Sequence, residues 1–359
     1  MEATVSKPSS VRTFPLGELS RDQTFLIRAF AVFLMVLCHV LDSGLPGWHW
    51  MAGDFDVAAR LAKTAGLCVP IFAFLSGYGM SFAYAKEGGL GKNYLNTLVR
   101  ILKFLVSYWF IFLVFFLPFV IASGSFTWSN FALSLIGWDG YVPFSWYVWF
   151  YVLALLGLPL LHLVLDKNKW LALVLSYVPL LLVYLLLAWK FQSWGYYDIT
   201  ARSLHIFICM LVGYSFGRHH LFTYFASLLR KRWILDLVCG ILLLGLLALY
   251  FWRLLGVLYC FILIPLMFLL NALTSHPWPK WLSLPLGFFG KASMEYWFLH
   301  GFFFSSQVFA VFPSSAIVSW AYDSLLITLV ILLVCTPFAW GINRLQKLVF
   351  DKKSVPISK

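Results

Sequence analysis

Long apolar runs separated by short polar segments dominate the chain from residue 26 onward. Most of these runs are close to the roughly 20 residues that an α-helix needs to cross the hydrocarbon core of a bilayer. The pattern therefore predicts an all-α polytopic membrane protein, a bundle of about ten transmembrane helices. The expected helices are 26–44, 67–85, 101–122, 146–165, 170–189, 204–217, 233–250, 254–272, 292–311 and 319–341.

The polar segments between these runs are short. Asp166 to Lys169 is all that separates two of the expected helices, and the connection around Arg253 is equally brief, so both predict antiparallel hairpins. No internal repeat or long linker divides the chain. We expect a tail at 1–25, one transmembrane domain at 26–341 and a second tail at 342–359.

Composition agrees with this fold class. The chain is 62% hydrophobic and only 11% charged, which excludes a soluble enzyme, a disordered chain and a disulfide scaffold. Its six cysteines all fall in apolar runs and form no Cys-x-x-Cys pair. They are typical of small core residues, so the sequence predicts neither disulfides nor a metal site.

The net charge of +12 would first suggest a nucleic-acid partner. Of the 26 basic residues, however, 21 fall on one side of the expected topology and 5 on the other. The positive-inside rule then places both termini in the cytoplasm, and the charge reflects topology rather than nucleic-acid binding. The Arg230–Arg232 run is a cytoplasmic surface with a possible role at lipid headgroups.

Ionisable residues inside the expected helices are candidates for function, because they are costly to keep in lipid. Arg28 and His39 lie eleven residues apart in the first helix, which puts them on one face and about 16 Å apart along the axis. That spacing suits a phosphate-rich ligand held at the inner mouth, with chemistry further across the membrane. A buried histidine that only packs against another helix is the plain alternative.

Asp42 follows three residues after His39 on the same face. It has two interpretations: a carboxylate that orients the imidazole and raises its basicity, or a polar residue at the outer boundary of the helix.

Three further groups stand out, each with a simpler structural interpretation. Pro70, Ser76 and Gly77 suit either a site or a kinked packing helix, and Arg100 and Lys103 project two cations one turn apart. Glu295, four residues after Lys291, is an acid inside an expected span. Gly213 and Gly217 form a Gly-x-x-x-Gly pattern that indicates a close helix contact.

Taken together, these residues resemble the acyltransferase-3 family of membrane acyltransferases. The similarity rests on the order and spacing of several motifs over nearly the whole chain. They are Arg28-x10-His39, Phe74-Leu75-Ser76-Gly77-Tyr78, Arg100-x-x-Lys103, Trp146-Tyr147 and the Ser293-to-His300 segment. The chain departs from the family at Lys103, where arginine is usual and would offer a two-pronged phosphate contact.

The resemblance implies transfer of an acyl group, commonly acetyl, from cytoplasmic acyl-CoA to a hydroxyl of a surface or exported glycan, or of a lipid-linked saccharide. It implies acyl-CoA as a cosubstrate, no bound cofactor and a bacterial inner membrane, with membrane lipids as further partners. His39 would be the catalytic base or acyl carrier, with Asp42 beside it. Carried over in the same way, the acyl-CoA-binding residues are Arg28, Arg100, Lys103, Ser76 and Tyr78, and the supporting residues are Glu295, His300 and Trp146.

Two other classes of function remain open from the residues alone. In a proton-coupled transporter or flippase, His39, Asp42 and Glu295 would form a path through the membrane. Paired broken helices in two halves of the chain would favour that class, and the sequence shows no convincing partner for Pro70. A sensory or scaffold protein would leave the intramembrane histidine without a role.

Overall fold

A computed structural model describes residues 17–42, 51–52, 55–84, 89–138, 140–193, 195, 197–228, 232–253, 257–311 and 324–350. Within these residues, nine helical segments are long and apolar enough to cross a membrane, which confirms an all-α polytopic membrane protein. The nine segments are Arg21–Asp42, Val57–Tyr84, Leu90–Ala122, Trp146–Leu165, Lys169–Lys190, Tyr197–Arg218, Trp233–Trp252, Leu258–Ser275 and Ser324–Leu348.

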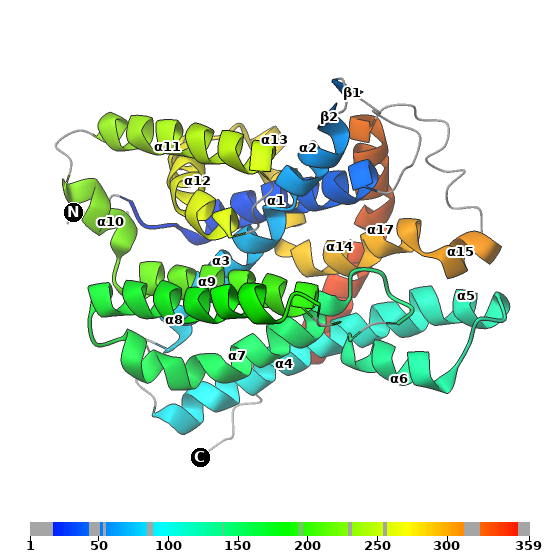
Figure 1. Cartoon of the computed structure of the whole chain (residues 1–359). Coiled ribbons are helices and arrows are strands. Elements are labelled where there is room, and N and C mark those ends of the chain that lie inside the picture. Colours follow the sequence, from blue (N-terminus) through cyan, green and yellow to red (C-terminus); the bar gives the residue numbers. More distant parts are fainter. Residues whose placement is uncertain are drawn as a thin grey trace, which may run out of the picture.

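Helix α1 (Arg21–Asp42) is the central element of the bundle. It packs against α2 (Val57–Ala65), α3 (Cys68–Tyr84), α13 (Lys280–Lys291) and α17 (Ser324–Phe350). In Figure 1 it lies between the layer of α11 (Arg232–Arg253) and α12 (Leu258–Ser275) and the layer of α8 (Lys169–Lys190) and α9 (Tyr197–Arg218).

The remaining elements are short or complete the bundle around this centre. They are β1 (Met51–Ala52), β2 (Phe55–Asp56), α4 (Leu90–Ile111), a π-helical turn (Phe112–Phe116), α5 (Leu117–Ala122), α6 (Trp128–Ile136), α7 (Trp146–Leu165), α10 (Leu221–Leu228), α14 (Ser293–Leu299), a 3₁₀ turn (His300–Phe304) and α15 (Ser306–Val311). The two strands form a minimal antiparallel ladder before α2.

Glycines allow α3 and α9 to pack backbone to backbone. A Cβ on Gly213 would overlap the carbonyl of Phe74, and one on Gly77 would overlap the carbonyl of Met210. Gly217 lies against Tyr78 and Ser81 in the same way. The close contact predicted from the Gly-x-x-x-Gly pattern is therefore present, and α3 is the partner helix.

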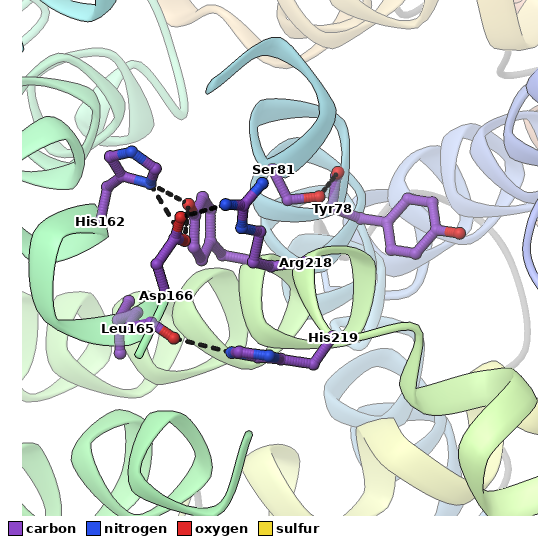
Figure 2. A network of polar contacts seen from close by, with 8 residues as sticks. Tyr78, Ser81, His162, Leu165, Asp166, Arg218 and His219 are labelled. Atoms are coloured by element: carbon purple, nitrogen blue, oxygen red, sulfur yellow. Dashed lines mark hydrogen bonds and ion pairs between the residues drawn. The ribbon is translucent and has the colours of Figure 1, made fainter. Parts of the chain in front are cut away.

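A polar network joins the end of α7 to the end of α9 (Figure 2). The Asp166 carboxylate forms ion pairs with Arg218 and, at 3.1 Å, with His162, and it accepts a hydrogen bond from the Tyr214 hydroxyl at 2.9 Å. Next to it, the His219 ring contacts the Leu165 carbonyl at 2.7 Å. The network therefore ties the C-terminal end of α7 to the C-terminal end of α9.

Several predicted boundaries need correction. The helix expected at 204–217 extends over 197–218, because its polar first turns stay helical. Helix α1 begins at Arg21 and α17 continues to Phe350, so both expected tails are partly helical. Residues 1–16 and 351–359 of those tails, and residues 319–323 of the last expected helix, lie outside the described residues.

The span expected at 292–311 is not one helix. It consists of α14, a 3₁₀ turn and α15, which together replace the continuous helix that the apolar run predicts. Gly301, in the 3₁₀ turn, packs against the 143–144 loop, and a Cβ there would lie 3.3 Å from the Pro143 carbonyl oxygen. The turn therefore brings His300 against that loop, a tertiary contact that a local apolar pattern does not report.

Candidate active site

A cavity at one end of the bundle gathers basic side chains from three helices. Arg28 of α1 meets Arg100 and Lys103 of α4 and Lys291 at the end of α13. Arg100 and Lys103 reach the same cavity because they lie one helical turn apart. We call this the cationic cavity. Its other lining residues are Phe72, Ser76, Phe104, Tyr147, Tyr151, Ser293, Met294, Glu295, Trp297, Asn343 and Gln346.

The cationic cavity carries an excess of positive charge. Glu295 is the single acidic residue among its lining residues, which include four cations. Within the described residues, neither Arg28 nor Arg100 forms an ion pair with a carboxylate; Arg100 contacts the Met80 sulfur instead. Two arginines without a carboxylate partner in one cavity suit an anionic ligand such as a phosphate group.

Helix α14 leads from this cavity toward the middle of the bundle and carries unsatisfied polar atoms. Glu295 Oε1, Trp297 Nε1 and, one residue past the helix, His300 Nε2 are buried and have no hydrogen-bond partner within the described structure. Buried polar groups without partners are rare and call for an explanation. Glu295 and Trp297 also line the cationic cavity, so they offer an acceptor and a donor to a polar ligand there.

Two histidines face each other where this helix meets α1. The ring centroids of His39 and His300 are 5.2 Å apart, and Phe144 stacks on His39 with a centroid distance of 3.5 Å. His300 Nδ1 lies 3.1 Å from the Tyr296 carbonyl, which can only accept a hydrogen bond. In a neutral imidazole the proton is therefore assigned to Nδ1, which leaves the unpartnered Nε2 as a base or acceptor.

Asp42 does not orient His39 in this structure. Its carboxylate forms an ion pair with Lys63 of α2 at 3.8 Å, and both side chains are about half exposed. The nearest ring neighbours of His39 are Phe144, His300 and Phe304. The geometry thus agrees with the boundary interpretation of Asp42, because α2 offers it a lysine at the end of α1.

Ser76 and Tyr78 face opposite ways, although both were expected along one ligand path. Ser76 lines the cationic cavity. Tyr78 is buried on the other side of α3, where its hydroxyl donates to Glu18 at 2.8 Å and accepts from the Leu19 amide at 3.0 Å. Residues two apart on a helix point in nearly opposite directions, so Tyr78 holds the segment before α1 and lies away from the ligand path.

The other expected residues divide between two places. Glu295 lines the cationic cavity and His300 belongs to the histidine pair. Trp146 lies in a second cavity, with the Arg202 guanidinium 5.2 Å above its ring. Its neighbour Tyr147 lines the cationic cavity and packs 4.7 Å from the Trp297 ring.

Sequence reasoning missed Phe144, Asn343 and Gln346 as parts of this region. The positive φ of Phe144 (64°) is rare for a bulky residue, and nothing local in the sequence signals it. Asn343 and Gln346 were assigned to the start of the tail, but α17 continues past them. The sequence did offer one signal: Asn343 and Gln346 are two polar residues three positions apart, directly after the last apolar run.

The fold and the site define a multi-pass membrane protein with a cluster of cations and, further along α1, a pair of facing histidines. A family model described as an acyltransferase domain matches residues 26–344. The chain therefore belongs to the acyltransferase-3 family and is a membrane acyltransferase. Comparison with curated proteins and with solved structures produced no match.

Proposed function

We propose that this protein transfers an acyl group, in the first instance acetyl, from cytoplasmic acyl-CoA to a hydroxyl group of a surface or exported glycan in a bacterial inner membrane. The observation that carries the proposal is the cationic cavity, which brings Arg28, Arg100 and Lys103 together. Arg28 lies on α1, the helix that also carries His39. The prevalence of basic residues on this side of the chain supports a cytoplasmic donor.

The donor would bind by its charged end. Arginine and lysine side chains neutralise the CoA phosphates, and Lys291 adds a fourth cation at the mouth. The thioester arm then follows α14, where Glu295 and Trp297 offer an acceptor and a donor to its amide groups. This orientation places the thioester near the histidine pair.

His39 is proposed as the general base. It takes the proton of the acceptor hydroxyl as the hydroxyl oxygen attacks the thioester carbonyl carbon. The carbon–sulfur bond breaks, the acyl group leaves on the acceptor oxygen, and the proton passes from His39 to the departing CoA thiolate. His300, whose buried Nε2 has no hydrogen-bond partner among the described residues, would hydrogen-bond the reacting groups.

Acetyl-CoA binding by the purified protein tests this proposal. We would compare wild type with Arg28→Ala, His39→Ala and the control Lys190→Ala, a basic residue at the end of α8 that is not part of the cavity lining. Losing a charge-assisted contact of about 1.5–3 kcal/mol should weaken binding by roughly 10- to 150-fold in Arg28→Ala. His39→Ala should bind like wild type but transfer no acetyl group.

Equal binding by Arg28→Ala and Lys190→Ala would contradict the assignment of the donor site. Absence of acetyl-CoA binding in every form, repeated with succinyl- and butyryl-CoA, would contradict acyl-CoA as the donor and favour the transporter class.

A further inference from the structure

A second cavity of about 570 Å³ lies beyond the histidine pair from the cationic cavity. It is formed by the loop that precedes α7, the start of α9 and the start of α15. Its lining includes the aromatic residues Trp138, Tyr141 and Trp146 and polar residues, among them Asp198, Arg202 and Gln307. We call it the aromatic cavity.

The lining combines flat aromatic faces with hydrogen-bonding groups. Arg202 stacks over Trp146 and, within the described residues, forms no ion pair, although Asp198 lies one turn earlier in the same cavity. Both side chains are exposed, so their polar atoms are available to a ligand. Sites with this size and mixture bind small molecules that carry both apolar and hydroxyl-bearing surfaces, and a saccharide ring presents both.

Phe144 separates this cavity from His39. Its side chain lines the cavity and stacks on the imidazole with a ring-centroid distance of 3.5 Å and an interplanar angle of 21°. It is also 5.5 Å from the His300 ring and nearly parallel to it. A molecule in the cavity therefore meets the Phe144 ring before it meets either histidine.

The backbone at Phe144 is held in a conformation that side chains such as this one avoid. Its φ of 64° is in the left-handed region. Strained residues of this kind persist only where the surroundings enforce them, and they cluster at functional sites. With this backbone conformation, the Phe144 ring stacks on His39, the proposed base. The residue before it, Pro143, lies against Gly301.

We propose that the aromatic cavity binds the acceptor saccharide and that Phe144 is a positioning residue that covers His39 until the acceptor displaces its ring. This proposal rests on the acyl-CoA-dependent function above and adds the acceptor's binding site. The Phe144 ring over His39 would keep water from the reaction, because water is also a nucleophile that can attack the thioester. Water that reached the thioester would give the free carboxylate, CoA thiol and one proton, which wastes the donor.

The first experiment measures acetyl-CoA hydrolysis without any acceptor, by release of the CoA thiol. We would use Phe144→Gly, which removes the ring and relieves the positive φ, so that backbone strain does not threaten folding. Phe144→Tyr keeps an aromatic ring over His39. Trp189→Ala is the matched control, because Trp189 is an exposed aromatic residue at the end of α8 that lines neither cavity.

Hydrolysis should rise about tenfold or more in Phe144→Gly and stay at the wild-type rate in Phe144→Tyr and Trp189→Ala. Acetyl-CoA binding is measured on the same samples. Normal binding with no rise in hydrolysis would overturn the role of Phe144 and leave the donor site intact. Failure of the wild type itself to bind acetyl-CoA would instead count against the proposed function.

The second experiment tests the ligand. Saturation-transfer NMR on the protein in lipid nanodiscs, free of sugar-based detergent, would use methyl glucopyranoside, N-acetylglucosamine and glucuronate as probes. We expect transfer to at least one of them in wild type and its loss in Trp146→Ala. Transfer to none of the three, or equal transfer in Trp146→Ala, would overturn the assignment of the cavity to a saccharide.

Discussion

The neighbour of His39 is a second histidine, His300, whereas one interpretation of the sequence placed the Asp42 carboxylate beside it. His300 arrives from a segment 261 positions further along the chain and lies 5.2 Å away between ring centroids, while Asp42 pairs with Lys63. An exposed ion pair of this kind contributes little to stability, about 0–1 kcal/mol. The chemistry proposed for this site therefore depends on the two imidazoles.

The consequence can be measured on single substitutions. Asp42→Asn should lower acyl transfer by about fivefold at most, the equivalent of a lost surface pair. His300→Gln should lower it about tenfold or more, because a hydrogen bond to a charged reacting group is worth about 1.5–3 kcal/mol. The assay is incorporation of labelled acetyl from acetyl-CoA into the glycan fraction of membrane vesicles, with expression levels matched.

A loss in Asp42→Asn as large as that in His300→Gln would show that the carboxylate reaches His39 during the reaction. Acetyl-CoA binding, measured on the same variants, should remain at the wild-type level in both.

At the scale of elements, close packing of α3 on α9 holds the site in place. Helix α3 carries Ser76 toward the cationic cavity, and its opposite side is pressed against α9 through Gly77 and Gly213. Small residues permit this approach, and helix contacts in membranes depend on such packing. An added methyl group at Gly213 would force the two backbones apart.

Gly213→Ala should therefore destabilise the protein by about 1–3 kcal/mol, the usual cost of overpacking. Gly245→Ala is the control, because a Cβ at Gly245 meets nothing within 4 Å and alanine favours a helix. Thermal unfolding in detergent should show a lower midpoint for the first variant and an unchanged or higher one for the second. The reverse order would mean that α3 and α9 do not pack in this register.

At the scale of the whole molecule, the proposal depends on which end of the bundle faces the cytoplasm. The distribution of basic residues predicts that the cationic cavity lies at the cytoplasmic end and the Asp42–Lys63 pair at the outer end. Five of the six native cysteines are buried and Cys38 is partly buried, so they should react poorly with a polar reagent.

The orientation can be measured by labelling single cysteines that are introduced at the two ends of the bundle. In intact cells, a membrane-impermeant maleimide should label Lys63→Cys, whose side chain is 55% exposed in the native residue. It should label Lys347→Cys, at the exposed end of α17, only after the membrane is permeabilised. Labelling of the two in the opposite pattern would reverse the topology and place the cationic cavity outside.

The sequence alone determined the fold class, most of the helices and several residues that share the cationic cavity. Apolar length and helical periodicity are local properties, so they could be read without a structure. Arg28 was identified in this way, and so was the small-residue contact at Gly213. Arg100 and Lys103 were assigned to the ligand only through the resemblance to the family.

Tertiary packing decided the rest. It placed Asp42 against Lys63 and Tyr78 against Glu18, broke the expected span at 292–311, and brought His300 and Phe144 to His39. Each of these outcomes depends on which distant helix occupies the facing surface. Periodicity reports only which way a side chain points, and the partner is set by how the helices come together.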